Sequence, residues 1–299
     1  MTFKANPSYI KTKEDAELFL STFDNFLLDC DGVIWLSETL IPGVGDFLKY
    51  LDDHNKRYAF VTNNSSKSRD AYLTKVHELG LDRLGIGPGS KIWVLGDEGI
   101  EEELRIEGYF PLGGSDPSLD EEFYPKHPLL TVDPDVRAVV AGSTTRFNFL
   151  RCATTLQYLM HDNKLLPYIG TNGDRNYPGL YGLILPAGGA LVEHLSFCSD
   201  RKYTNVGKPD TVLAETILRN TGFDRLETVM IGDTLTSDIK FGNDAQLGGG
   251  HGTMLVLSGV TSFDDLKGLL EQPITRQSRK LGAKFFVDSL TRLIELLVE

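Results

Sequence analysis

The chain has 299 residues, of which 41% are hydrophobic, so it can bury a substantial core in one large domain or two. Its formal net charge of -12 argues against a general nucleic-acid-binding protein, because such proteins present a basic face to phosphates. Small anionic substrates stay compatible with this charge, since a metal ion or a few local donors can invert the potential at one site.

Cysteine usage and hydropathy indicate the compartment. Only three cysteines occur, at positions 30, 152 and 198, which is no disulfide framework and fits a reducing environment. The first residues are polar and resemble no secretion signal, and no apolar stretch has the length needed to span a bilayer. We therefore expect a cytoplasmic protein with neither a membrane nor a nucleic acid as partner.

The first third of the sequence alternates strand and helix patterns. A helix pattern that follows Gly43 and one that is closed by Gly80 separate three short apolar runs. This rhythm predicts a parallel sheet with helices on its faces. The predicted elements are a strand at Phe23–Leu28, a helix at Val44–His54, a strand at Arg57–Val61, a helix at Ser68–Leu79 and a strand at Lys91–Leu95.

The middle of the chain differs from its two ends. Asp116–Asp135 is rich in Pro, Asp and Glu and predicts a long loop or insertion. A strand at Ala138–Ala141, a helix at Asn148–Met160 and a strand at Leu166–Ile169 follow. The glycine-rich stretch Gly170–Gly189 predicts little regular structure and is typical of a binding loop.

The last third returns to the strand and helix rhythm. We predict helices at Pro209–Asn220 and Asp238–Ala245, strands at Glu227–Ile231, Met254–Leu257 and Lys284–Val287, and a terminal helix. The simplest architecture is α/β, with a doubly wound parallel-sheet core built from both ends of the chain. In this prediction residues 1–89 and 203–299 form the core, and residues 90–202 form an inserted second domain.

Two carboxylates, Asp29 and Asp31, follow the first predicted strand. If the strand continues through them, they leave on the same side, because strand side chains repeat with period two. Two negative groups placed in this way repel each other unless a cation lies between them or one of them is protonated. A polar turn after a strand would also explain this segment taken alone.

Further polar groups stand where other predicted strands end or helices begin. They are Thr62–Ser66, Lys208 before a helix, Asp233 after Gly232, and Asp238 on the next helix. A turn, a surface lysine and a helix cap would explain each of them singly. Ligands of open α/β sheets bind at the carboxyl ends of the strands, so the joint occurrence favours one common site.

This combination of residues predicts phosphoryl chemistry. Clustered carboxylates suit Mg²⁺, a hard cation that takes oxygen ligands. Thr62, Asn63 and backbone N–H groups can hold phosphate oxygens, and Lys208 supplies a positive charge. A carboxylate can itself act as the nucleophile and form an aspartyl-phosphate.

With these motifs the chain resembles the haloacid dehalogenase (HAD) superfamily of phosphatases. The D-x-D-G-[VT] motif is matched by Asp29–Val33, the hydroxyl motif by Thr62, the lysine motif by Lys208 and the G-D-x₄-D motif by Gly232–Asp238. Five segments are similar to those of 4-nitrophenylphosphatases, phosphoglycolate phosphatases and pyridoxal phosphate phosphatases: DCDGVIW, VTNNSS, TNGDRNYP, GKP and LVLSGV. The similarity is greatest to the fungal branch of 4-nitrophenylphosphatases and phosphoglycolate phosphatases.

The resemblance implies a Rossmann-like HAD core and a role for each carboxylate. Asp29 would attack the phosphorus, and Asp31 would protonate the leaving oxygen and then activate water. Mg²⁺ would be held by the side chains of Asp29 and Asp233 and the main-chain carbonyl of Asp31, with Asp238 in support. Thr234 follows Asp233 where relatives often carry Arg or Asn, a change that removes no metal ligand.

The resemblance also implies a substrate site and a lid. The insertion corresponds to a C2-type α/β cap domain, which would cover the metal site, exclude water and mediate a homodimer. The residues expected to bind the phosphoryl group and the rest of the substrate are Thr62, Asn63, Asn64, Lys208, Asn172 and Asp174.

The expected function is Mg²⁺-dependent hydrolysis of small phosphate monoesters through a phospho-aspartate. The substrates would be metabolites such as 2-phosphoglycolate, cleared as side products, and 4-nitrophenyl phosphate in vitro. Pyridoxal phosphate or phosphoproteins are alternative substrates within the family. A phosphoacceptor module like a response-regulator receiver, or a regulatory relative with little turnover, is an alternative from another class. A nicotinamide-binding enzyme is disfavoured, because no G-x-G-x-x-G follows the first strand.

Overall fold

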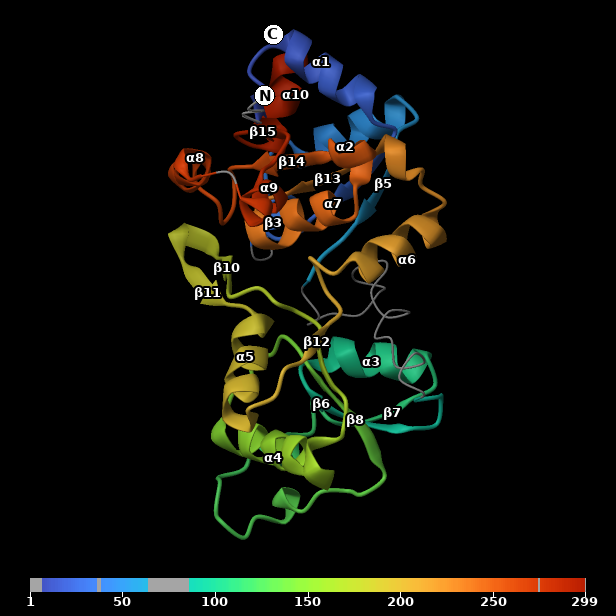
Figure 1. Ribbon diagram of the computed structural model, residues 1–299, viewed down its shortest axis with the longest axis vertical. Helices are drawn as coiled ribbons and strands as arrows, with labels where there is room; N and C mark the ends of the chain where they lie inside the picture. Colours follow the sequence, from blue (N-terminus) through green and yellow to red (C-terminus); the bar gives the residue numbers. More distant parts are fainter. Residues whose placement is uncertain (1–6, 37–38, 64–85, 274, 299) are drawn as a thin grey trace. The chain divides into compact units, whose positions relative to one another are not determined.

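The computed structural model describes residues 7–36, 39–63, 86–273 and 275–298, which form two compact units (Figure 1). The first unit comprises Met1–Thr62, Tyr177–Leu185 and Lys208–Glu299. The second comprises Asn63–Asn176 and Pro186–Gly207. The predicted helix at Ser68–Leu79 and the predicted substrate residue Asn64 lie outside the described residues.

A six-stranded sheet in which every strand pair is parallel forms the centre of the first unit. The prediction of a parallel α/β core is confirmed. The strand order is β1 (Ser8–Tyr9), β15 (Phe285–Val287), β14 (Thr253–Val256), β13 (Thr228–Gly232), β2 (Asn25–Leu28) and β5 (Arg57–Phe60). A small antiparallel pair, β3 (Trp35–Leu36) and β4 (Thr39–Leu40), follows β2 in the chain.

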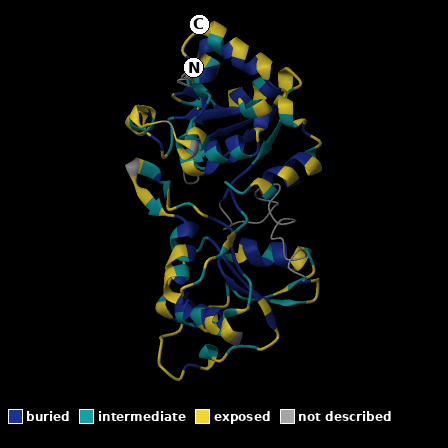
Figure 2. Cartoon of the chain, in the orientation of Figure 1, coloured by how far each residue is buried: buried dark blue, intermediate teal, exposed yellow. Residues whose placement is uncertain are grey.

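Both faces of this sheet are buried because its strands are apolar on both sides. In β2, Phe26 and Leu28 belong to one hydrophobic core and Leu27 to the core on the other face. Figure 2 shows the central strands as buried throughout. The helices of this unit are α1 (Lys13–Thr22), α2 (Val44–Asp53), α6 (Thr211–Thr221), α7 (Lys240–Asp244), α8 (Phe263–Glu271), α9 (Arg276–Leu281) and α10 (Leu290–Val298).

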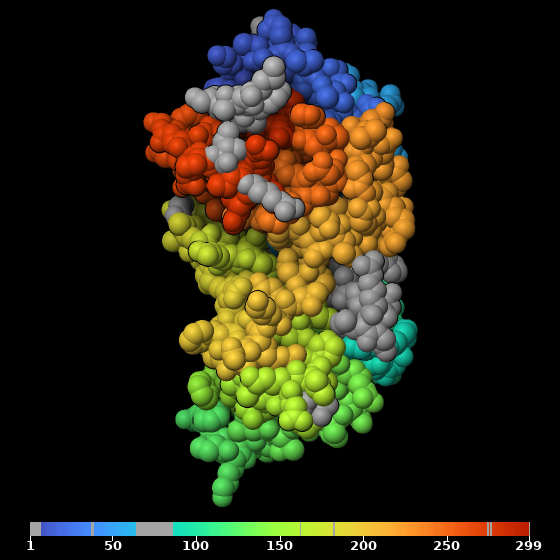
Figure 3. Space-filling model, viewed as in Figure 1, coloured from blue at the N-terminus to red at the C-terminus, as the bar shows by residue number. Residues whose placement is uncertain are grey.

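The two ends of the chain meet in this first unit. Helix α1, near the N-terminus, packs against α10, near the C-terminus, as the adjoining blue and red surfaces in Figure 3 illustrate. The sequence analysis did not predict α1, although it begins at a capping box made by Thr12 and Asp15. Both ends therefore contribute to one core, as the alternating pattern predicted.

The second unit repeats the design on a smaller scale. Its five-stranded parallel sheet has the order β12 (Thr204–Asn205), β9 (Tyr168–Gly170), β8 (Val136–Ala141), β6 (Lys91–Leu95) and β7 (Phe110–Gly113). Its helices are α3 (Glu98–Ile106), α4 (Phe149–Met160) and α5 (Gly188–Ser199). In β6, Trp93 and Leu95 point to one core, and Ile92 and Val94 to the other.

Three features depart from the predicted organisation. The second unit begins at Asn63, whereas the predicted insertion begins at residue 90. The second unit extends to Gly207 rather than ending at residue 202, because β12 pairs with β9. The stretch Gly170–Gly189, expected to be irregular, contains β9's end, strand β10 (Asn176–Pro178), strand β11 (Ile184–Pro186) and the start of α5. Residues 177–185 of this hairpin belong to the first unit. The sequence pattern did not predict these elements, because glycine and proline are usual in turns and infrequent in regular structure.

The other predicted elements agree with the structure within a few residues. Asp116–Asp135 is a loop that contains only two short 3₁₀ turns, at Pro117–Asp120 and Pro128–Leu130. The predicted helix at Asp238–Ala245 begins earlier, with a π-helical turn at Leu235–Ile239 that leads into α7. Within the described ranges, no helix is both long and apolar enough to cross a membrane.

Candidate active site

The candidate site lies where the strand order of the first unit's sheet diverges. Strands β2 and β13 are neighbours, and the chain continues from β2 to β5 on one side and from β13 to β14 on the other. Such a switch point leaves room for a ligand at the carboxyl ends of the strands. Asp29 stands directly after β2, and Asp233 directly after β13.

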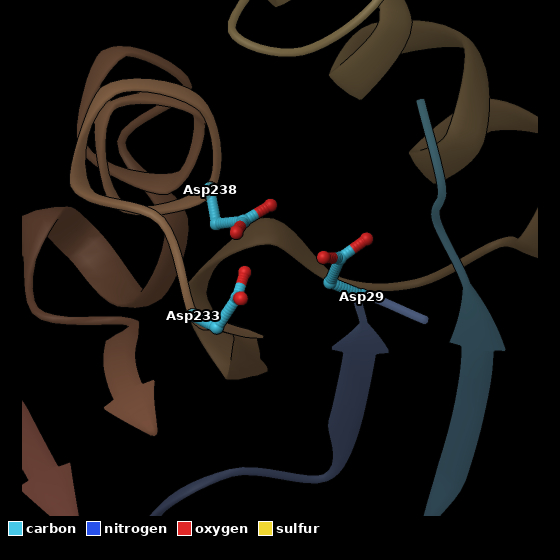
Figure 4. Close-up of side chains that lie close together, drawn as sticks. All are labelled: Asp29, Asp233 and Asp238. Carbon is cyan, nitrogen blue, oxygen red and sulfur yellow. The ribbon is translucent and has the colours of Figure 1, made fainter. Parts of the chain in front are cut away.

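Three carboxylates converge at this point. Asp29, Asp233 and Asp238 are all buried, and each offers one oxygen within 4.8 Å of those of the other two. Figure 4 shows the three side chains turned toward one another from two strand ends and the turn after β13. The predicted joining of these three positions is therefore what the fold produces.

Two glycines lie so close to the Asp233 carboxylate that a side chain at either position would overlap with it. A Cβ atom added at Gly259 would lie 1.9 Å from Asp233 Oδ2, and one added at Gly32 would lie 2.2 Å from the same oxygen. Gly32 also has a φ of +84°, in the left-handed region that a side chain disfavours. The glycine of the D-x-D-G motif is thus required by the backbone and by the neighbouring carboxylate together.

Backbone and hydroxyl donors fix the two later carboxylates. Asp233 Oδ2 accepts a hydrogen bond from the Val260 N–H at 2.7 Å, and its Oδ1 accepts one from the Thr234 hydroxyl at 2.9 Å. Asp238 Oδ2 accepts from the Thr234 N–H at 3.0 Å, across the π-helical turn. Thr234 therefore orients both carboxylates.

Lys208 neutralises part of this cluster. Its ammonium lies 2.5 Å from Asp29 Oδ1 and 2.7 Å from Asp238 Oδ1, and it donates a hydrogen bond to the Val61 carbonyl at 2.8 Å. Only 1% of Lys208 is exposed, so the surface-lysine interpretation is wrong. The side chain joins the ends of two strands and the turn after a third.

The remaining negative charge is costly in this environment. Burial, reinforced by the charge of Asp238 and opposed by Lys208, raises the pKa of Asp29 from 3.8 to about 6. Burial and the charges of Asp238 and Asp29 raise the pKa of Asp233 well above its usual value. Both pKa shifts arise first from burial and then from the charge of the neighbouring carboxylates.

The donor set fits a divalent cation. Three buried carboxylate oxygens within bridging distance are hard ligands, which Mg²⁺ prefers. A cation among them would relieve the repulsion that, together with burial, raises the pKa of Asp29 and Asp233. Asp29, Asp233 and Asp238 are thus the residues whose side chains could hold the metal.

Asp31 is separate from the carboxylate cluster. Strand β2 ends at Leu28, and the chain turns through Cys30 and Gly32, so the expected period-two alignment with Asp29 does not apply. Asp31 is half-buried, and its Oδ1 accepts a hydrogen bond from the Trp35 indole at 3.1 Å. The charge of Asp31 also raises the pKa of Tyr177, after burial, so this tyrosine of the β10–β11 hairpin lies near it. The sequence analysis did not single out Trp35 or Tyr177.

The predicted phosphate and substrate residues fall into two groups. Thr62, which is buried, belongs to the first unit with Lys208. Asn63, Asn172 and Asp174 belong to the second unit, where they contact one another. Their contact with a substrate stays a prediction.

Comparison with known proteins agrees with this fold and site. Residues 26–85 match a model described as haloacid dehalogenase-like hydrolase, and residues 205–291 match one described as HAD-hydrolase-like. A 4-nitrophenylphosphatase of Schizosaccharomyces pombe is 33% identical, over 96% of this chain and 98% of the relative. A glycerol-3-phosphate phosphatase of Rattus norvegicus is 32% identical, over 95% and 94%.

A solved structure shows that the fold is similar as well as the sequence. The p-nitrophenyl phosphatase from Archaeoglobus fulgidus superposes with a TM-score of 0.69 at 26% identity, covering 91% of this chain and 98% of its own. A parallel α/β core with carboxylates at the switch point is compatible with phosphoryl transfer, and the phosphatase relatives assign the chain to the hydrolases. The chain belongs to the haloacid dehalogenase-like hydrolases, among relatives of the 4-nitrophenylphosphatase and glycerol-3-phosphate phosphatase type.

Proposed function

We propose that the protein hydrolyses small phosphate monoesters with Mg²⁺ as cofactor, through a phospho-aspartate. The observation that carries the proposal is the buried cluster of Asp29, Asp233 and Asp238 with Lys208 bound to the first and third. The family to which the chain belongs, and the phosphatase names of its relatives, support the same reaction.

The chain's own residues supply the chemical groups. A carboxylate oxygen of Asp29 attacks the phosphorus while the bond to the ester oxygen breaks, and Asp31 gives its proton to the leaving oxygen. Asp31 then takes a proton from a water molecule, which attacks the phosphorus of phospho-Asp29 and releases phosphate and the free carboxylate. When bound, Mg²⁺ neutralises charge between Asp29 and the phosphate dianion.

Lys208 and Thr62 have supporting roles in this scheme. The Lys208 ammonium orients Asp29 and offers positive charge to the phosphoryl oxygens, and we assign to the Thr62 hydroxyl, which follows β5, the role of a donor to them. The Trp35 indole, which donates to Asp31 Oδ1, fixes the side chain that must exchange protons. In-line positioning and charge stabilisation are the main demands of phosphoryl transfer.

The substrates we propose are small metabolites. 2-Phosphoglycolate is the candidate from the phosphoglycolate phosphatase resemblance, and glycerol 3-phosphate is the candidate from the rat relative. Comparing kcat/KM for both, with pyridoxal phosphate and a phosphotyrosine peptide included, distinguishes them. Equal values for all four would argue against a dedicated substrate. We also propose a homodimer in the cytoplasm, which light scattering and cell fractionation would test.

The decisive experiment replaces the nucleophile. Asp29→Asn should abolish turnover of 4-nitrophenyl phosphate with Mg²⁺, because an amide cannot form the phospho-aspartate. Asp24→Asn is the matched control: Asp24 is an exposed aspartate of the same unit that pairs with Lys56, so this variant should keep full activity. Substantial turnover by Asp29→Asn would refute the nucleophile assignment, and a long-lived phosphoprotein in the wild type would favour a phosphoacceptor module instead.

A further inference from the structure

A set of polar contacts in the second unit connects two segments that are distant in sequence. Asn63 Nδ2 donates to Asp174 Oδ2 at 2.9 Å, and Asn172 Nδ2 donates to the Asn63 carbonyl at 3.0 Å. The Asp174 N–H donates in turn to Asn172 Oδ1 at 2.7 Å. Asn63 is therefore held at both its side chain and its main chain, and both amides are buried.

The segment that ends the second unit packs against the same place. Asn205 Nδ2 donates to the Gly207 carbonyl at 3.0 Å, and Asn205 pairs with Gly170 in the sheet. A Cβ atom added at Gly207 would lie 2.7 Å from Asn63 Oδ1 and 2.6 Å from the Thr171 carbonyl oxygen. Only a glycine permits this approach, so the backbone at 207 packs closely against the side chain of Asn63.

The two segments so connected continue directly into the candidate active site. Thr62 precedes Asn63 in the chain, and Lys208 follows Gly207. The network therefore holds the backbone next to a phosphoryl-binding hydroxyl and next to the lysine bound to Asp29. Small displacements of either group would reduce the rate of phosphoryl transfer, because the reaction depends on positioning.

We propose that Asp174 is a positioning residue, which acts through Asn63 to fix the backbone from which Thr62 and Lys208 extend. The inference rests on the proposed function, because it concerns the same phosphoryl site. Asp174 binds Asn63 by a charge-assisted hydrogen bond, which is stronger than a neutral one. A carboxylate is also a poor contact for an anionic ester, since like charges repel.

The two roles of Asp174, positioning and substrate contact, give different kinetics. A positioning role affects the phosphoryl group, which all substrates share. Asp174→Ala should then lower kcat/KM by about 10- to 100-fold, and by the same factor for 4-nitrophenyl phosphate, 2-phosphoglycolate and glycerol 3-phosphate. A contact with the rest of the substrate would instead give a loss that differs between these esters.

A double-mutant cycle tests the route through Asn63. If Asp174 acts through Asn63, adding Asp174→Ala to Asn63→Ala should cause no further loss of kcat/KM. Asp174→Asn keeps an acceptor oxygen and should restore most of the activity. Asp135→Ala is the control, because Asp135 is an exposed aspartate of the same unit that pairs with Lys91, and the variant should be unchanged. Melting temperatures show whether each variant is folded.

The results that overturn the inference are separate from those that overturn the proposed function. Ester-dependent losses, or losses that add fully in the cycle, would overturn the positioning role. A wild-type protein that hydrolyses no ester would overturn the proposed function. In that case the side-chain amide signal of Asn63, followed by ¹⁵N NMR, still tests the network: Asp174→Ala should shift it, and an unchanged signal would refute the contact.

Discussion

Replacing Lys208 with methionine tests the electrostatics of the candidate site in the metal-free protein. Methionine keeps most of the apolar stem but removes the ammonium from Asp29, Asp238 and the Val61 carbonyl. Removing one partner of a buried ion pair typically costs about 3–5 kcal/mol, because it leaves an uncompensated charge. We expect a loss of unfolding free energy of this size near neutral pH.

The pH dependence of this loss follows from the Asp29 carboxyl. Its pKa is raised from 3.8 to about 6 in the folded protein, so its stabilising contribution is complete below about pH 4 and is lost as pH rises through about 6. At pH 7.5 the ionised Asp29 of the wild type costs about 3 kcal/mol, at 1.36 kcal/mol per pKa unit.

Protonation of Asp29 limits how much unfolding free energy the Lys208→Met variant can lose through this residue. Without Lys208, the buried Asp29 can become neutral by binding a proton. Because its pKa in the unfolded chain is 3.8, this protonation costs about 5 kcal/mol at pH 7.5. Asp29 thus accounts for at most about 2 kcal/mol of the loss. At about pH 5 Asp29 is largely protonated in both proteins, so this part should vanish.

Urea unfolding in the presence of EDTA at both pH values measures the effect. Trp35 lies in the first unit and Trp93 in the second, so a Trp93→Phe background reports the unfolding of the first unit by fluorescence. Lys49→Met is the control, because the Lys49–Asp53 pair is exposed and screened by solvent, so its loss should change the unfolding free energy little at either pH. A loss for Lys208→Met that is equal at the two pH values would refute the reasoning.

Two further predictions concern the metal. Asp233→Asn removes one buried negative charge while its amide can still meet Val260 and Thr234, so it should raise the melting temperature in EDTA and abolish the increase that Mg²⁺ gives the wild type; a retained Mg²⁺ increase would exclude Asp233 as a ligand. Gly259→Ala places a Cβ 1.9 Å from Asp233 Oδ2 and should weaken Mg²⁺ binding at least about tenfold by calorimetry, the effect seen when groups that orient a ligand are lost. Gly268→Ala in α8, whose added Cβ has no neighbour within 4 Å, should leave binding unchanged and add about 0.5–1 kcal/mol of stability; equal effects of the two changes would refute the steric argument.

The sequence by itself determined the parallel core and the carboxylates of the site. Apolar runs such as Phe26–Leu28 are buried on both faces, which is the pattern of a strand between two helix layers. Asp29 and Asp233 could be assigned to one site because parallel strands end at a common edge, and Lys208 was added to it by the joint occurrence of the motifs. Local pattern and a rule of topology were enough for these residues.

Other features depended on contacts that local pattern does not record. The hairpin of β10 and β11 arises in a glycine-rich stretch, and Thr204–Asn205 become a strand only by pairing with β9. Strand β2 ends at Leu28, so the period-two argument cannot place the side chain of Asp31 relative to that of Asp29. A two- or three-residue strand has little intrinsic preference, so its partner decides whether it forms.

The roles of individual polar residues were also decided by the tertiary structure. The sequence placed Asn63, Asn172 and Asp174 together as substrate residues, but only the fold shows that they bind one another. The sequence also could not show that Lys208 is buried between Asp29 and Asp238. The residue types and spacing predict which chemistry is available, whereas the pairings of Asn63 with Asp174, and of Lys208 with Asp29, join segments more than a hundred residues apart in the chain.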